Sequence, residues 1–206
     1  MVVSAGGTME AIDPVRVITN HSSGKMGYAL AEAARDRGAA VVLVTAPTAL
    51  PDPVLVKVVQ VRTAQQMGKA IQEYVKGADA LVMAAAVADY RPVEEAEQKI
   101  KKADDALNIA LTKTTDILKT AKGDFVRVGF AAESENLVEN AQAKVGSKNL
   151  DLIVANDITA DGSGFGSDTN KVTIIDRDLA VEELPLLTKY EVGNRILDRV
   201  NQLFRD

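Results

Sequence analysis

The sequence predicts an α/β protein with a Rossmann-like fold, a mainly parallel sheet with helices on both faces, plus an inserted arm and a C-terminal hairpin. Apolar segments typical of buried parallel strands recur at 41–45, 80–90, 125–133 and 152–156. Segments with helical spacing of apolar residues separate most of these strands. Strands that alternate with helices form right-handed crossovers, which place the helices on both faces of one sheet.

Composition indicates one folded domain, which we assign to residues 1–206. The net charge of −5 argues against a nucleic-acid-binding surface, so an anion site has to be built locally. The chain has no cysteine and one histidine, His21, which excludes disulfides, a thiolate nucleophile and a multi-histidine metal centre. No apolar run approaches the roughly 20 residues that a membrane span needs. We therefore expect no membrane partner and a cytoplasmic location.

The N-terminal segment predicts a strand, a long loop and a helix. A β-branched run from Val2 breaks at Gly6 and Gly7, and a helix is expected to end near Arg37–Gly38, with Ser22 or Ser23 as its cap. Glycines and unpaired N–H groups at a helix start suit a nucleotide phosphate or a carboxylate. An ordinary connection is the alternative, but such connections usually take roughly 2–6 residues. Met1 stands directly against the first strand, so we expect further sequence before it.

The next elements supply a second candidate wall for a site. After the strand at 41–45, we expect a third strand at 54–61 and a helix that Thr63 caps and that ends near Val75. The strand at 80–90 ends in small residues followed by Asp89. Ligands of open α/β sheets bind outside the carboxyl ends of the strands, so the alanines leave room for a flat ring. The alternative is that they only allow tight packing of a helix.

Residues 91–113 interrupt this rhythm and predict an inserted arm, charged at 94–102 and strand-like at 107–111. A lysine run there is usually a solvated surface. A short helix opens at 114–118, and the strand at 125–133 follows. Ser134 is the expected cap of a helix over 135–145 that Gly146 stops. Lys144 near its end and Lys148 just beyond it either reach one ligand or complement the helix dipole.

The C-terminal part closes the fold. After the strand at 152–156, the glycine-rich segment 161–167 indicates a flap or turn, since no helix follows it. A hairpin is predicted over 171–175 and 180–184. The final helix, 189–204, has one buried face, made by Val192, Ile196, Val200 and Leu203.

Several common chemistries lack their motifs. A nicotinamide site needs G-x-G-x-x-G and an acidic residue about 20 residues later, whereas Gly6-Gly7-Thr8 lacks the third glycine and the second strand ends in Thr45-Ala46-Pro47. A Walker A loop is also missing. With one histidine and no cysteine, a serine or cysteine nucleophile has no evident base.

The combined motifs resemble the bacterial type of phosphopantothenate-cysteine ligase. They run in order to about Asn170 and comprise Gly6-Gly7-Thr8, Ile12-Asp13-Pro14-Val15-Arg16, Asn20-His21-Ser22-Ser23-Gly24-Lys25-Met26-Gly27, Ala84-Ala85-Ala86-Val87-Ala88-Asp89-Tyr90, Lys99-Ile100-Lys101-Lys102, Val128-Gly129-Phe130-Ala131-Ala132-Glu133 and Asn149-Leu150-Asp151. The resemblance implies ligation of 4'-phosphopantothenate with cysteine, with CTP as co-substrate, Mg²⁺, and an acyl-cytidylate intermediate.

The resemblance also implies roles for matching residues. Lys99 corresponds to the lysine that helps form the acyl cytidylate, and Asn20 to the asparagine that handles it, with Gly7 and Arg16 on the acyl-substrate side. The nucleotide-binding positions are Met83, Ala84, Ala85, Asp89, Lys99, Thr114, Thr115, Asp116, Ile117, Phe130, Lys144 and Lys148. The segment Thr114-Thr115-Asp116-Ile117 departs from the family's usual Asn-Pro before Asp-Ile, which main-chain contacts would tolerate. No magnesium ligand is identified.

The family's members are homodimers, so the hairpin or the arm is expected to supply a subunit contact, and a decarboxylase domain often precedes this one. Two other classes stay open: a non-catalytic nucleotide-binding module and an NAD(P)-dependent oxidoreductase.

Overall fold

A computed structural model describes residues 1–101, 107–133, 135–157, 162–164 and 166–204. It contains one large sheet, three two-stranded ribbons and five helices within these residues. No helix in this part of the chain has the length and apolar character to cross a bilayer.

The large sheet has the strand order of a Rossmann fold. Six parallel strands lie in the order β5, β4, β1, β6, β9, β10, and two antiparallel strands, β12 and β13, extend it beyond β10. Their bounds are β1 Val2–Ala5, β4 Val42–Thr45, β5 Lys57–Gln60, β6 Ala80–Met83, β9 Val126–Glu133, β10 Leu152–Asp157, β12 Val172–Asp176 and β13 Val181–Glu183. The chain order reverses between β1 and β6, the place where such sheets bind ligands. The predicted sheet and C-terminal hairpin are confirmed.

Helices cover both faces of this sheet, as predicted. Their bounds are α1 Lys25–Asp36, α2 Ala64–Tyr74, α3 Ile117–Thr120, α4 Leu137–Lys148 and α5 Lys189–Leu203. Leu30 of α1 and Ile196 of α5 belong to one buried cluster, whereas Ile71 of α2 and Val145 of α4 belong to the other. Burial of each such side chain contributes about 1.5–3 kcal/mol.

The start of α1 is held close to β1, which fixes one wall of the switch point. A Cβ added to Gly27 would lie 2.6 Å from the Ala5 Cβ and 2.7 Å from the Ser4 carbonyl oxygen, so only glycine allows this approach. Gly24 is the N-cap residue, with φ of 79° and no side-chain cap hydrogen bond. The expectation that Ser22 or Ser23 caps α1 is therefore wrong, because the chain enters the helix through a left-handed glycine.

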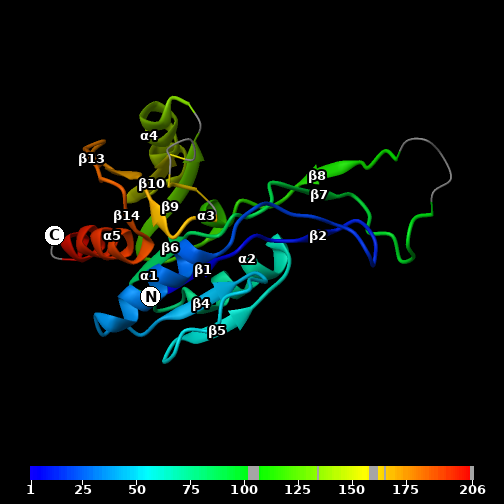
Figure 1. The fold of residues 1–206 in the computed structure, drawn as a ribbon, viewed down its shortest axis with the longest axis horizontal. Helices are drawn as coiled ribbons and strands as arrows, with labels where there is room; N and C mark the ends of the chain where they lie inside the picture. The colour runs from blue at the N-terminus through cyan, green and yellow to red at the C-terminus, as the bar shows by residue number, and fades with distance from the viewer. Residues whose placement is uncertain (102–106, 134, 158–161, 165, 205–206) are drawn as a thin grey trace.

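Two paired ribbons run side by side away from the sheet (Figure 1). One is the first hairpin, β2 (Glu10–Ala11) with β3 (Val17–Ile18), which occupies what the sequence predicts as a loop. The other is the arm, whose base pairs β7 (Tyr90–Pro92) with β8 (Leu111–Lys113). Ala96 of the arm donates its N–H to the Ile12 carbonyl of the hairpin at 3.0 Å. A third ribbon pairs β11 (Thr169–Asn170) with β14 (Leu187–Thr188).

Several predicted bounds differ from the structure. The strand of the arm lies at 111–113, not 107–111, and the third strand begins at Lys57. Helix α4 continues through Gly146 to Lys148 and ends at Asn149, which adopts a φ of 50°. Asparagine tolerates the left-handed conformation that ends a helix, so Gly146 is not the stop. Several predicted positions lie outside the described residues: the cap Ser134, Lys102 of the family motifs, and Asp161 and Phe165 of the glycine-rich segment.

Candidate functional site

The loops that follow β1 and β6 are joined at the switch point. Gly7 and Ala86 form a parallel bridge, and the Ala86 N–H donates to the Gly6 carbonyl at 2.9 Å. The Thr8 Oγ1 accepts the Ala88 N–H at 2.9 Å. The two chain segments therefore continue their pairing beyond the last residues of the strands, and each fixes the other's position.

Asn20 is locked into this junction. Its Nδ2 donates to the Ala86 carbonyl at 2.7 Å, and its Oδ1 accepts the Ser22 N–H at 3.0 Å. A Cβ on Gly7 would overlap the Asn20 carboxamide, so Gly7 makes room for it. The two predicted substrate-side residues thus lie in contact. Within the described residues, the second N–H of the Asn20 amide has no acceptor, so it can serve a ligand.

A first cavity of about 360 Å³ opens over the carboxyl ends of β6 and β9, between the loop after β6 and helices α3 and α4. We call it the α4 cavity. Of the predicted nucleotide-binding residues, its lining includes Met83, Ala85, Asp89, Thr114, Thr115, Asp116, Ile117, Phe130, Lys144 and Lys148. The structure therefore brings together positions that come from four separate stretches of the chain.

Specific contacts fix the polar groups of the α4 cavity. Thr114 donates its N–H to the Asp89 carbonyl at 2.9 Å and its hydroxyl to the Ala88 carbonyl at 2.6 Å. Asp116 caps α3 and forms an ion pair with Lys148, with Oδ2 3.1 Å from Nζ. Lys144 and Lys148 stand on successive turns of one face of α4, as their spacing predicts. An anionic ligand here would meet the ammonium groups of Lys144 and Lys148.

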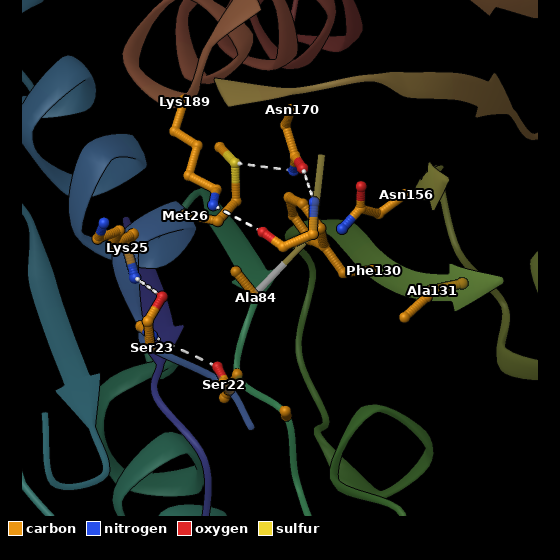
Figure 2. Close-up of a pocket in the computed structure, with 15 residues that line it drawn as sticks. Ser22, Ser23, Lys25, Met26, Ala84, Phe130, Ala131, Asn156, Asn170 and Lys189 are labelled. Carbon is orange, nitrogen blue, oxygen red and sulfur yellow. Dashed lines mark hydrogen bonds between the residues drawn. The ribbon is translucent and has the colours of Figure 1, made fainter. Parts of the chain in front are cut away.

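A second, smaller cavity of about 140 Å³ lies on the α1 side of the same strand ends. We call it the α1 cavity. Figure 2 shows Lys189 and Met26 on one side of it and Phe130 and Asn156 on the other, with Ala84 between them. Ala84, predicted to bind the nucleotide, lines this cavity instead of the α4 cavity. The two cavities adjoin, because both are lined by Ala85, Ala86, Phe130, Ala131 and Ala132.

Lys189 is the polar group of the α1 cavity that sequence reasoning missed. It is 5% exposed, and its ammonium donates to the Gly164 carbonyl at 3.0 Å and to the Ser167 carbonyl. Burial, and then the positive charge of Lys25, lower the pKa of Lys189, while Asp168 raises it. Lys25 itself pairs with Asp168 at 2.6 Å, which lowers the pKa of that carboxyl. In the sequence, Lys189 looks like an ordinary exposed residue in the first turn of a helix.

Lys99 is not brought into the α4 cavity. It lies exposed on the arm, beyond β7, and is not among the residues that line either cavity. Arg16 lies on the neighbouring first hairpin and donates to the carbonyl of Ile100, which follows Lys99, so these two predicted residues are close to each other. Their two ribbons run away from the large sheet, whose strand ends carry the α4 cavity (Figure 1).

One buried carboxylate ties this outlying region together. Asp13 accepts the Val15 N–H at 2.9 Å, the Arg16 N–H at 2.8 Å and the Ile100 N–H of the arm at 3.1 Å. It also holds the Arg16 guanidinium, which reaches the Ile100 carbonyl at 3.2 Å. These hydrogen bonds, the Arg16 side chain foremost, hold the pKa of Asp13 well below its usual range. The Asp-Pro pair signals the turn, but no sequence signal indicates the link to Ile100.

The comparisons with known proteins agree with this architecture. The family described as the DNA/pantothenate metabolism flavoprotein C-terminal domain matches residues 1–204. The Coenzyme A biosynthesis bifunctional protein CoaBC of Bacillus subtilis is 45% identical over 207 residues, which span 98% of this chain and 51% of that protein. The chain thus spans about half the length of this relative.

Two solved structures are similar over nearly the whole chain. The crystal structure of the C-terminal domain of a CoaBC protein has a TM-score of 0.85 at 44% identity and covers 100% of this chain and 95% of that one. The DNA/pantothenate metabolism flavoprotein from Streptococcus pneumoniae has a TM-score of 0.84 at 26% identity, with 98% of both chains covered.

Proposed function

The chain belongs to the DNA/pantothenate metabolism flavoprotein C-terminal domain family, and from this premise we propose that it is a phosphopantothenate-cysteine ligase that consumes CTP. The α4 cavity carries the proposal. Residues that the family resemblance selects one by one, from segments scattered over the chain, line a single cavity at the switch point of a Rossmann-like sheet.

In the first half-reaction, a carboxylate oxygen of 4'-phosphopantothenate attacks the α-phosphorus of CTP, and the bond to the β-phosphate oxygen breaks to release pyrophosphate. The small side chains at the end of β6 leave room for the base, and Lys144 and Lys148 face the phosphates. A positive charge near the α-phosphate stabilises the charge that develops there. Lys99 has this role in our proposal, which requires it to reach the nucleotide from the arm.

In the second half-reaction, the cysteine amine attacks the acyl carbon, the bond from that carbon to the phosphate oxygen breaks, and CMP leaves while the nitrogen loses a proton. Asn20 is held rigidly by Ala86 and Ser22, so its second N–H is preorganised for the acyl oxygen. Gly7 keeps the space that this arrangement needs. Arg16 keeps donors beyond those bound to Asp13 and Ile100, which suits the phosphate of the acyl substrate.

Magnesium fits the same cavity. Proteins usually hold this ion through one or two carboxylates together with phosphate oxygens, and Asp89 and Asp116 line the α4 cavity. Across the described residues no cluster of three metal-ligating side chains exists, which agrees with an ion bound mainly by the nucleotide. When bound, it would offset the charge of the triphosphate.

A homodimer is part of the proposal. The arm and the first hairpin expose apolar side chains at Val15, Tyr90, Val93, Leu107 and Leu111, which are 63%, 47%, 51%, 49% and 47% exposed. Such a group outside the main core is typical of a surface that another chain covers. The CoaBC relative is described as bifunctional and is about twice as long as this chain, so fusion to a decarboxylase domain is part of the proposal. A cytoplasmic location is a further part of it.

The deciding experiment is a ligase assay with CTP and ATP in parallel. We expect release of CMP and pyrophosphate from CTP that depends on 4'-phosphopantothenate, and amide formation that depends on cysteine. Folded protein that shows neither dependence in the presence of Mg²⁺ contradicts the proposal. CTP binding in calorimetry without turnover would instead indicate a non-catalytic nucleotide-binding module.

A further inference from the structure

The α1 cavity has no assigned ligand once the nucleotide occupies the α4 cavity. We propose that it binds the amino-acid substrate, with the carboxylate of L-cysteine on the ammonium of Lys189. This inference rests on the proposed ligase function and adds the binding site of the second substrate.

Charge is the first argument. Among the described residues that line the cavity, Lys25 and Lys189 are positive and none is negative. Lys25 is paired with Asp168, whereas in the described part of the chain no carboxylate forms an ion pair with Lys189, on which Asp168 acts only from a longer distance. A buried ammonium without a counter-ion is unfavourable, and lysine is rarely buried unless paired. A ligand carboxylate would supply the missing negative charge.

The hydrogen-bond donors of the Lys189 ammonium also agree with a bound carboxylate. An ammonium has three N–H donors, and two of them go to the Gly164 and Ser167 carbonyls. These carbonyls come from the segment before β11 and hold the ammonium beside the cavity. Within the described residues, its third donor has no acceptor, so it can serve a ligand. Lys189 lies on the side of the cavity where Met26 also lies (Figure 2).

Size and lining select a small, partly apolar acid. The volume of about 140 Å³ exceeds the space for single waters and is well below that of typical cofactor pockets, about 300–1,000 Å³. Beside the cations stand Met26, Phe130 and Ala131. An aromatic ring makes favourable contacts with sulfur, so the Phe130 side of this wall suits the thiol of cysteine.

Position is the fourth argument. The wall between the two cavities contains Ala86, whose carbonyl holds Asn20 in place. A cysteine anchored on Lys189 would thus present its amine to an acyl group beside Asn20. It would approach from the side opposite Lys144 and Lys148, where CMP departs.

The test is Lys189→Met, which keeps the apolar stem and removes the charge. We expect KM for cysteine to rise about ten- to hundredfold, because one charge-assisted hydrogen bond to its carboxylate is lost. Turnover of cysteamine, which has the amine and thiol but no carboxylate, should not change. Pyrophosphate release from CTP and 4'-phosphopantothenate without cysteine should also stay unchanged. Lys171→Met, an exposed lysine of the neighbouring segment, is the matched control and should leave every parameter unchanged.

Three outcomes overturn the inference. An equal rise in KM for cysteine and for cysteamine would show that Lys189 only holds Gly164 and Ser167 in place. A raised KM for CTP would assign the cavity to the phosphates. If the variant does not fold, the unaltered protein decides, because the inference requires a KM for cysteamine at least about tenfold above that for cysteine. Absence of pyrophosphate release from the unaltered protein would contradict the ligase function itself, which keeps the two failures distinct.

Discussion

The carboxyl edge of the sheet and the arm place their functional side chains by different physical means. At the edge, the α4 cavity takes its residues from strand ends and helices that the two buried clusters hold in place. Along the arm, Lys99 follows a short ribbon and is positioned through its neighbour Ile100, which the buried carboxylate of Asp13 holds. Many packing contacts overlap at the edge, whereas hydrogen bonds to Asp13 and Arg16 hold this part of the arm.

This difference between the sheet edge and the arm should separate nucleotide binding from the rate of the first chemical step. Nucleotide affinity should survive most single changes on the arm, because the cavity is complete without it. The rate of acyl-cytidylate formation should be sensitive to them, since the lysine assigned to that step lies on the arm.

Lys99→Gln should have the largest effect. Removal of the charge that stabilises the α-phosphate should slow pyrophosphate release by about 10²–10³-fold, the size seen when one preorganised donor is lost. CTP affinity, measured by calorimetry, should change by less than about threefold, because Lys99 does not line the cavity. The matched control is Lys101→Gln, an exposed lysine two positions along. Equal losses from both variants would show that only the general charge of the arm matters.

Asn20→Asp should affect the other half-reaction. A carboxylate beside the Ala86 carbonyl keeps the shape but loses the amide donor and adds repulsion. Acyl cytidylate should accumulate, and amide formation should slow by about ten- to hundredfold. Mass spectrometry of single turnovers, with and without cysteine, measures both species. A variant that forms neither the intermediate nor pyrophosphate would place Asn20 in the first step.

Much of the edge could be predicted from the sequence, because strand ends and helix starts carry local signals. Thr63 with Gln66 forms the predicted cap of α2, and Lys144 and Lys148 share one face of α4. Long-range contacts carry no such signal. The burial of Lys189 depends on carbonyls that lie more than twenty residues away in the sequence. The hydrogen bond from Ile100 to Asp13 likewise joins the arm to a hairpin far from it in the sequence.

Asp13→Asn tests whether that link positions Lys99. The asparagine amide would meet the donors of Arg16 or Ile100, so the contact between the first hairpin and the arm beside Lys99 should loosen. We expect a fall of about tenfold in the rate of pyrophosphate release, with the KM for CTP unchanged. A variant with unchanged rate would show that Lys99 finds its position without this carboxylate.

Lys148→Met should have a smaller effect, on binding alone. Its ammonium is already paired with Asp116, so the gain from a phosphate is partly offset by the loss of that pair. We expect CTP affinity to fall about three- to tenfold, with the rate at saturating CTP retained. Lys119→Met, on the last turn of α3 and outside the cavity lining, is the control. A loss confined to the rate would place Lys148 at the reacting phosphate.

The smallest effect is the acid dependence of stability. Because the pKa of Asp13 is lowered in the folded protein, its ionised form stabilises the fold above the unfolded value of about 3.9, and this contribution is lost as the pH falls further. The difference in unfolding free energy between the protein and Asp13→Asn should therefore be constant near neutral pH and shrink below about pH 4. Denaturant titrations at several pH values measure it. A difference that does not depend on pH would mean that Asp13 acts through shape and not through charge, and the arm would then resemble the sheet edge in how it is held.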